Sequence, residues 1–171
     1  FGDDQVSTKI NHKKSEFGAS YRIGPRDFYG MSRDNEEIFH LADGTVLHRK
    51  ETGDPSHASM FMHNLNLNYS VQDPEKYLFN ATFRYWNNHQ PHWDYRGILS
   101  NLDNPNDYVD MVDLNSSDNQ VPALDLYYQR NLKNDQTLVF NVVGTYNRTS
   151  SHRFYQESRG EELLTDINNR V

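Results

Sequence analysis

Apolar residues recur at every second position over most of this chain. The clearest case is the segment 137–147, where Leu138, Phe140, Val142, Gly144 and Tyr146 share one side and Val139, Asn141, Val143, Thr145 and Asn147 share the other. The same alternation runs through 6–10, 17–23, 61–71, 77–86 and 121–130. A period of two is the pattern of a β-strand with two different faces. We therefore predict an all-β antiparallel meander of about six to eight strands of roughly 8–14 residues, longer than the usual five or six.

Three short polar turns divide this pattern into hairpins. They are "HKKSEF" at 12–17, "SVQDPEKYLF" at 70–79 and "NLKNDQTLVF" at 131–140. Longer polar connections are predicted at 26–56 and 88–120, with a third from Ser150. In an up-and-down sheet successive connections lie at opposite ends, so the short turns are expected to share one end and the long loops the other. The first connection should hold its own hairpin, because Asp43-Gly44 is a typical tight-turn pair.

Composition favours a membrane environment for such a sheet. Only 35% of the residues are hydrophobic, yet 13% are aromatic, which argues against disorder. Transmembrane β-barrels have strands of about ten residues, apolar outside and polar inside, with short periplasmic turns and long extracellular loops. Lipid then replaces a hydrophobic core. The alternative is a soluble β-sandwich or lipocalin-like barrel, whose strands also alternate.

Several classes of protein are disfavoured. The net charge of −7 opposes a general role in nucleic-acid binding. The absence of cysteine removes disulfide frameworks and thiol catalysis. No apolar run approaches the roughly 18 residues of a membrane-spanning helix. The chain begins at Phe1 without a signal peptide, and we expect it to be a piece of a longer protein.

The stretch "NNHQPHWDYR" at 87–96 holds the candidate ligand-binding residues His89, His92, Trp93, Asp94 and Tyr95. The aromatic rings could stack on a sugar, or simply anchor a loop at a membrane interface. The His and Asp residues could bind a metal, but no partner cluster is visible in the sequence, so no metal and no cofactor is predicted.

The segment that follows is rich in aspartate, at positions Asp103, Asp107, Asp110, Asp113 and Asp118. It lacks the glycine and glutamate of a helical calcium loop, and a solvated loop is expected. No catalytic motif is found, so the chain is predicted not to be an enzyme. Catalysis by loop carboxylates would need two of Asp94, Asp103, Asp107 and Asp110 within roughly 5–10 Å.

Three stretches carry a family resemblance: "INHKKSEFGASY", "MFMHNLNLNYSVQDPEKYLFNATFRYWNNHQPHWDYRG" and "ALDLYYQRNLKNDQTLVFNVVGTYNRT". They resemble the outer-membrane β-barrel family of Bacteroidetes, the barrel portion of TonB-dependent-receptor-like proteins. The resemblance implies localisation in the cell outer membrane and transport of a nutrient into the cell. It also implies a larger parent with a periplasmic carboxypeptidase-regulatory-like domain, a plug and a barrel of about 22 strands.

Within that family resemblance, residues 1–171 form a single barrel segment without a plug domain. The implied partners are outer-membrane lipid, the remaining barrel and plug, and an energy-coupling protein that acts through the parent. Arg22, Arg84, Asp125 and Gln129 are expected to face the lumen. An excised segment exposes two strand edges and could self-associate through them. The tail "GEELLTDIN" at 160–168 has a helical pattern, and we expect either a loop helix or disorder.

Overall fold

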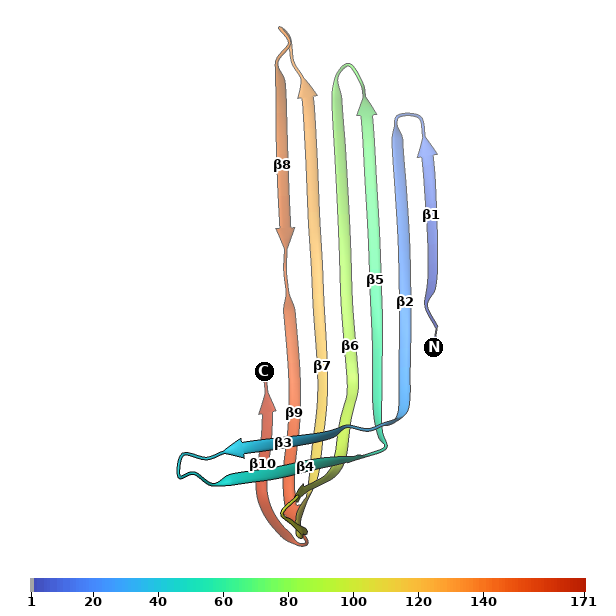
Figure 1. Cartoon of the computed structure of the whole chain (residues 1–171). Coiled ribbons are helices and arrows are strands. Elements are labelled where there is room, and N and C mark those ends of the chain that lie inside the picture. Colours follow the sequence, from blue (N-terminus) through green and yellow to red (C-terminus); the bar gives the residue numbers. More distant parts are fainter. Residues whose placement is uncertain (1) are drawn as a thin grey trace. The chain divides into compact units, whose positions relative to one another are not determined.

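The computed structural model describes residues 2–171, which form ten strands and no helix (Figure 1). The strands are β1 (Asp4–His12), β2 (Ser15–Met31), β3 (Asp34–His40), β4 (Val46–Asp54), β5 (Ser56–Asp73), β6 (Tyr77–Asn101), β7 (Asn104–Asn131), β8 (Thr137–Thr145), β9 (Arg148–Arg159) and β10 (Glu162–Arg170). They belong to one antiparallel sheet in the order β1-β2-β5-β6-β7-β9-β10; β8 also pairs with β7, and the β3–β4 hairpin joins through β4 to β6. The all-β antiparallel meander predicted from the sequence is confirmed, but the predicted number and length of strands are wrong: the described residues form ten strands of 7 to 28 residues.

The chain divides into two compact units, and five strands (β2, β5, β6, β7 and β9) contribute to both. Unit 1 comprises the N-terminal residues to Pro25, Phe61–His89 and Asn119–Thr149. Unit 2 comprises Arg26–Met60, Gln90–Asp118 and Ser150–Val171. Each unit therefore takes three separate stretches of sequence, held together by strand pairing.

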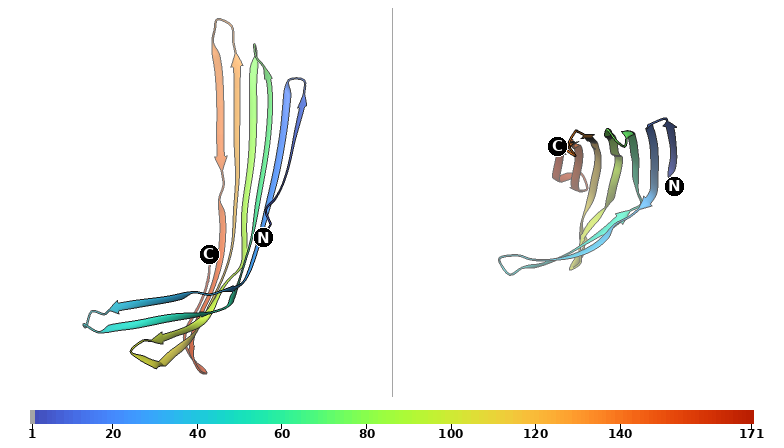
Figure 2. Two further views of the ribbon diagram at one scale, coloured as in Figure 1. Left: turned by 45° about the vertical axis from the view of Figure 1, so that its right-hand side comes forward. Right: turned by 90° about the horizontal axis from the view of Figure 1, so that it is seen from above.

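In unit 1 the strands lie side by side in the order β1-β2-β5-β6-β7-β8 (Figures 1 and 2). The register places alternating residues of neighbouring strands on the same face. In β7 and β8, Leu126 is opposite Val142 and Tyr128 is opposite Phe140. In β1 and β2, by the same rule, the pairs Val6–Tyr21 and Ile10–Phe17 share a face, while Ser7–Ser20 and Lys9–Gly18 share the other. The expected apolar and polar faces are thus present in both end hairpins.

The three short turns of unit 1 contact one another, as predicted for an up-and-down sheet. The Lys14 ammonium lies 2.6 Å from the Asp73 carboxylate, and the Gln72 amide donates to the Lys14 carbonyl at 3.0 Å. The Asn131 amide donates to the Lys76 carbonyl at 2.9 Å. The hydrogen bond and charge of Lys14 hold the pKa of Asp73 below its ordinary value. Direct contacts therefore place the three turns at one end.

The prediction of long loops at 88–120 and from Ser150 is wrong. Residues 88–120 belong to β6 and β7, which are joined by a turn between Asn101 and Asn104, and the segment from Ser150 forms most of β9 and β10. Within residues 26–56 the Asp43-Gly44 hairpin is confirmed: Gly44 has φ +85° and the Asp43 carboxylate accepts from the Thr45 amide at 2.9 Å. These polar segments form strands because a neighbouring strand satisfies their backbone groups, which outweighs low intrinsic β propensity. The left view of Figure 2 shows the β3–β4 hairpin beside the closing ends of β6 and β7.

The prediction of a helical or disordered tail is also wrong. Residues 162–170 form β10, which pairs with β9 from Glu162↔Arg159 to Arg170↔His152. The register shifts between Leu163 and Thr165, so that strict alternation is broken by one residue. That irregularity explains why the apolar spacing in this tail is not the regular period of a strand.

The buried hydrophobic residues of the described chain are Ala58, Leu99 and Met111, and all three belong to unit 2. In unit 1 the apolar face is exposed instead: Ile10 is 57% exposed, Phe140 63% and Val142 46%. A contiguous exposed apolar surface normally marks contact with lipid or another protein.

Candidate ligand-binding site

The five candidate residues of β6 do not form one site. Successive residues of a strand point to opposite faces, and the structure accordingly separates Trp93 and Tyr95 from His92 and Asp94. His89 is an exposed residue at the end of a unit 1 stretch. The five residues were predicted as one group because they are adjacent in the chain, although the alternation of a strand places neighbours on opposite faces.

Trp93 and Tyr95 line a cavity of about 690 Å³ in unit 2. Its other lining residues are mostly amides, hydroxyls and charged groups: Arg33, Met60, Gln90, Asp113, Asn115, Ser116, Ser117, Ser151, His152, Arg153 and Asn169. They come from β5, β6, β7, β9, β10 and the segment between β2 and β3. Gln90 and Trp93 of β6 are three residues apart and both line this cavity.

The aromatic side of the cavity is fixed by stacking. The rings of Trp93 and Tyr95 meet edge to face, with centroids 6.4 Å apart and planes at 81°. The Arg33 guanidinium lies 4.4 Å from the centre of the Tyr95 ring, a cation–π distance. Glu51 in turn holds Arg33, whose Nε donates to its carboxylate at 2.8 Å. This hydrogen bond raises the pKa of Arg33 above its ordinary value.

The opposite side is organised by a buried carboxylate. Asp113 is only 5% exposed and accepts two hydrogen bonds from Arg153, at 2.9 Å from Nε and 3.0 Å from Nη2. The Asn115 amide donates to the same carboxylate at 2.9 Å. The bond to Asp113 raises the pKa of Arg153 above its ordinary value. A two-pronged pair of this kind fixes geometry as well as charge.

This arrangement suits a polyhydroxylated ligand. A sugar ring has an apolar C–H face and an edge of hydroxyls that both donate and accept. Aromatic rings match the face, while amides and hydroxyls such as Gln90, Asn115 and Ser117 supply donors and acceptors. The carboxylate of Asp113 is neutralised by Arg153, so the cavity does not require a charged ligand.

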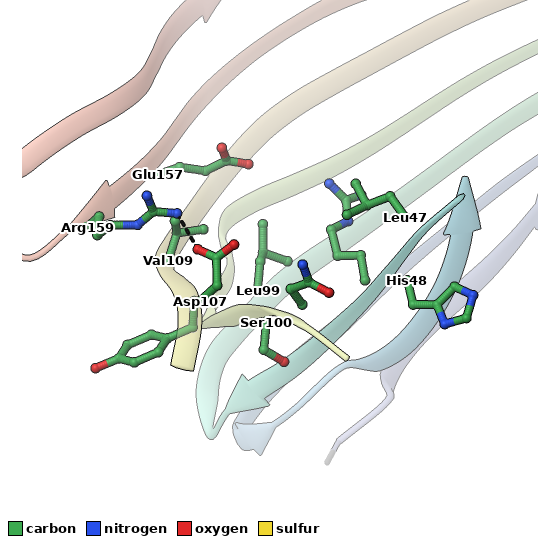
Figure 3. Close-up of a pocket in the computed structure, with 11 residues that line it drawn as sticks. Leu47, His48, Leu99, Ser100, Asp107, Val109, Glu157 and Arg159 are labelled. Carbon is green, nitrogen blue, oxygen red and sulfur yellow. Dashed lines mark hydrogen bonds and ion pairs between the residues drawn. The ribbon is translucent and has the colours of Figure 1, made fainter. Parts of the chain in front are cut away.

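Two smaller cavities adjoin the same unit 2 strands. One of about 180 Å³ has the apolar side chains of Leu47, Leu99 and Val109, and an ion pair of 2.6 Å joins Arg159 and Asp107 across it (Figure 3). Another, of about 350 Å³, is lined mainly by paired charges from β3, β4, β7 and β9. Neither combines Trp and Tyr rings with several amides and hydroxyls, as the cavity of about 690 Å³ does.

In unit 1 the polar face has a cavity of about 440 Å³ lined by Asn68, Tyr69, Ser70, Asn80, Thr82, Asp125, Tyr127 and Asn141. It shows that even positions of β5 and β6 share a face with odd positions of β7 and β8. By the same alternation, Arg84 and Gln129 lie on this face. A side chain at Gly18 would meet Asn68, so this face of β2 is the polar face. Arg22 is four residues from Gly18 and therefore lies on the same face. The four residues expected to face a lumen therefore share one polar face.

Four of the five aspartates lie on β7, Asp103 lies in the turn before it, and three of the five contact a side chain from another strand. Arg153 binds Asp113, Arg159 binds Asp107, and the His48 ring lies 3.6 Å from Asp103. Arg153 and His57 were not predicted as site residues, because Arg153 is 40 residues from Asp113 and His57 is 35 residues from His92. The alternation of β9 indicates on which face of the strand Arg153 lies, but not that its partner is Asp113.

No protein-family model matches the chain, and no curated protein or solved structure matches it. Among residues 2–171, no helix is long and apolar enough to span a membrane.

Proposed function

We propose that this chain is part of the transmembrane barrel of an outer-membrane protein that binds or takes up a nutrient at the cell surface. The observation that carries the proposal is the two-faced sheet of unit 1. One face presents apolar side chains such as Phe140 and Val142, both largely exposed. The other presents amides and charges such as Asp125 and Asn141. Lipid on the first face and a wet lumen on the second satisfy both.

The dimensions of unit 1 fit this assignment. The nine residues of β8 extend about 27 Å at roughly 3.4 Å per residue. A strand tilted by about 45° would then cross about 19 Å, close to the roughly 25 Å apolar band of such barrels. The edges of β1 and β8 are where the rest of a barrel would pair. The resemblance to TonB-dependent-receptor-like proteins supports a plug and an energy-coupling protein as partners of the parent.

The cavity of unit 2 supports a ligand at the cell surface, and its chemistry favours carbohydrate. Trp93 supplies the aromatic surface, and the side chains opposite it supply hydrogen bonds. The alternative is a soluble module that binds carbohydrate through the same aromatics. In that alternative the apolar faces would meet in a core, and the chain would fold without lipid or detergent.

Folding in two media distinguishes these readings. Far-UV circular dichroism and size-exclusion chromatography of the chain are compared in plain buffer and in detergent micelles. A monodisperse β-rich species only in micelles is the expected result. A folded monomer in plain buffer contradicts the barrel assignment and favours the soluble module.

Ligand binding is tested with a panel of neutral oligosaccharides and two tryptophan variants. Trp93→Ala removes the aromatic surface and is expected to weaken binding roughly tenfold or more, as for a central contact residue. Trp86→Ala is the matched control, because Trp86 belongs to unit 1 and is not among the residues that line the cavity. Equal loss in both variants, or none in Trp93→Ala, contradicts the assignment of the cavity.

A further inference from the structure

A second cluster lies on the face of β6 opposite Trp93 and Tyr95. His92 and Asp94, two residues apart on β6, meet His57 of β5. One ligand atom from each of the three side chains lies within 4.8 Å of the others. The Nδ1 atom of His92 is 3.7 Å from the Oδ2 atom of Asp94. Two ligands about 2.1 Å from a tetrahedral metal lie about 3.4 Å apart, a spacing that ligand atoms within 4.8 Å of one another can reach by a side-chain rotation.

A fourth side chain holds the first histidine in place. The Asp27 carboxylate of β2 lies 2.6 Å from Nε2 of His57. Histidines that bind metals generally direct their other ring nitrogen to a carboxylate, which fixes the ring and raises its basicity. Asp27 therefore leaves Nδ1 of His57 for a metal. The Tyr29 ring stacks on His57 with centroids 4.4 Å apart and planes at 3°, which restrains the ring further.

We propose that His57, His92 and Asp94 bind a divalent transition metal, best matched by Zn²⁺, with Asp27 as the positioning residue. Two imidazoles and one carboxylate are a donor set that zinc favours, and calcium, which prefers oxygen ligands, does not. Three protein ligands leave a fourth position for water or for a group from a bound molecule. The His57 and His92 rings stack at 4.8 Å, so His92 must rotate to bind; its side chain is 51% exposed and has room to do so.

This inference departs from the sequence analysis, which predicted no metal. The missing ligand was His57, 35 residues before His92 in the chain and brought to it by the pairing of β5 with β6. The cluster lies wholly in unit 2. It therefore does not depend on whether unit 1 faces lipid, and the two proposals can fail independently.

The test uses the full chain in whichever medium, buffer or micelles, yields the monodisperse β-rich form. Isothermal titration with Zn²⁺ gives the affinity, and titration with Co²⁺ gives a visible absorption band that reports tetrahedral nitrogen and oxygen ligation. His92→Ala and Asp94→Asn should each weaken binding by at least about 100-fold, and Asp27→Asn by about 10- to 100-fold. His48→Ala is the matched control, because His48 faces a single carboxylate, Asp103, at 3.6 Å.

Binding with one site per chain, lost in the two ligand variants and kept in His48→Ala, supports the proposal. Circular dichroism of each variant checks that the strands still form; His92 and Asp94 are not buried, so their replacement should leave the fold intact. The proposal is overturned if the unmodified chain binds Zn²⁺ no more tightly than His92→Ala and Asp94→Asn do. It is also overturned if His48→Ala loses as much affinity as they do.

Discussion

The substitution Val142→Arg places a charge in the middle of the apolar face of unit 1. Val142 is the sixth of the nine residues of β8 and lies opposite Leu126. Its neighbour Asn141 is the central residue of the strand and lies opposite Tyr127 on the polar face. The two positions therefore have nearly the same depth and opposite orientation, which makes Asn141→Arg a matched control.

The expected cost follows from that depth. One residue along a strand tilted by about 45° changes the depth by only about 2.4 Å. In the proposed barrel Val142 would lie near the bilayer midplane, where an outward-facing Arg costs about 2–4 kcal/mol. Asn141→Arg points to the wet side, and its cost should stay below about 1 kcal/mol. Val142→Ala measures the part of the cost that comes from lost apolar volume alone.

The free energy of unfolding is measured by urea titration of the chain in phospholipid vesicles, with far-UV circular dichroism as the signal. Val142→Arg should be the least stable of the three variants, and Asn141→Arg close to the unmodified chain. Equal costs for the two Arg variants, or a larger cost for Asn141→Arg, would refute the assignment of the faces.

Three further predictions concern single contacts. Arg153→Met leaves a buried carboxylate without its cation; because Arg153 is half exposed, we expect a loss of about 1–3 kcal/mol in urea unfolding, below the 3–5 of fully buried pairs. Gly97→Ala would place a Cβ 2.3 Å from a backbone oxygen of β4, whereas a Cβ at Gly144 meets nothing within 4 Å. Gly97→Ala should therefore lower the free energy of unfolding by about 1–3 kcal/mol and Gly144→Ala by less than about 1 kcal/mol. Equal shifts of the melting temperature in the two variants would contradict this. Lys14 lowers the pKa of Asp73 below its ordinary value of 3.8. The contribution of the Asp73 carboxylate to stability is therefore present above pH 3.8 and is lost as pH falls through the lowered pKa. Thermal melts between about pH 5 and pH 2 should show this loss of stability in the unmodified chain and a smaller loss in Lys14→Met.

Local patterns predicted the strands and turns of unit 1 because its sheet has one apolar and one polar face. Alternation in 121–130 and 137–147 specified which residues share a face, and the register of β7 with β8 confirms it. The three turns were visible as short polar interruptions, and their contacts confirm that they lie together. Periodicity is informative where one face is apolar and the other polar.

The same reasoning failed in unit 2, where both faces are largely polar. The continuation of β6 and β7 through 88–120 carries many asparagines and aspartates, which resemble a loop when each residue is considered alone. Partner strands decide its structure, and the sequence does not state the pairing. For the same reason Asp113 and His57 were not assigned their partners, which are 40 and 35 residues away. Trp93, Tyr95, His92 and Asp94 were identified in advance by their chemistry, but without their partners on other strands.

Oxygen accessibility along β8 tests the central claim most directly. The chain has no cysteine, so single cysteines at positions 138 to 143 can each carry a nitroxide label without interference. In lipid bilayers, labels at 138, 140 and 142 should be accessible to oxygen dissolved in the lipid, and labels at 139, 141 and 143 to a water-soluble nickel reagent. Accessibility that does not alternate with a period of two, or alternates in the opposite sense, would contradict a lipid-facing sheet.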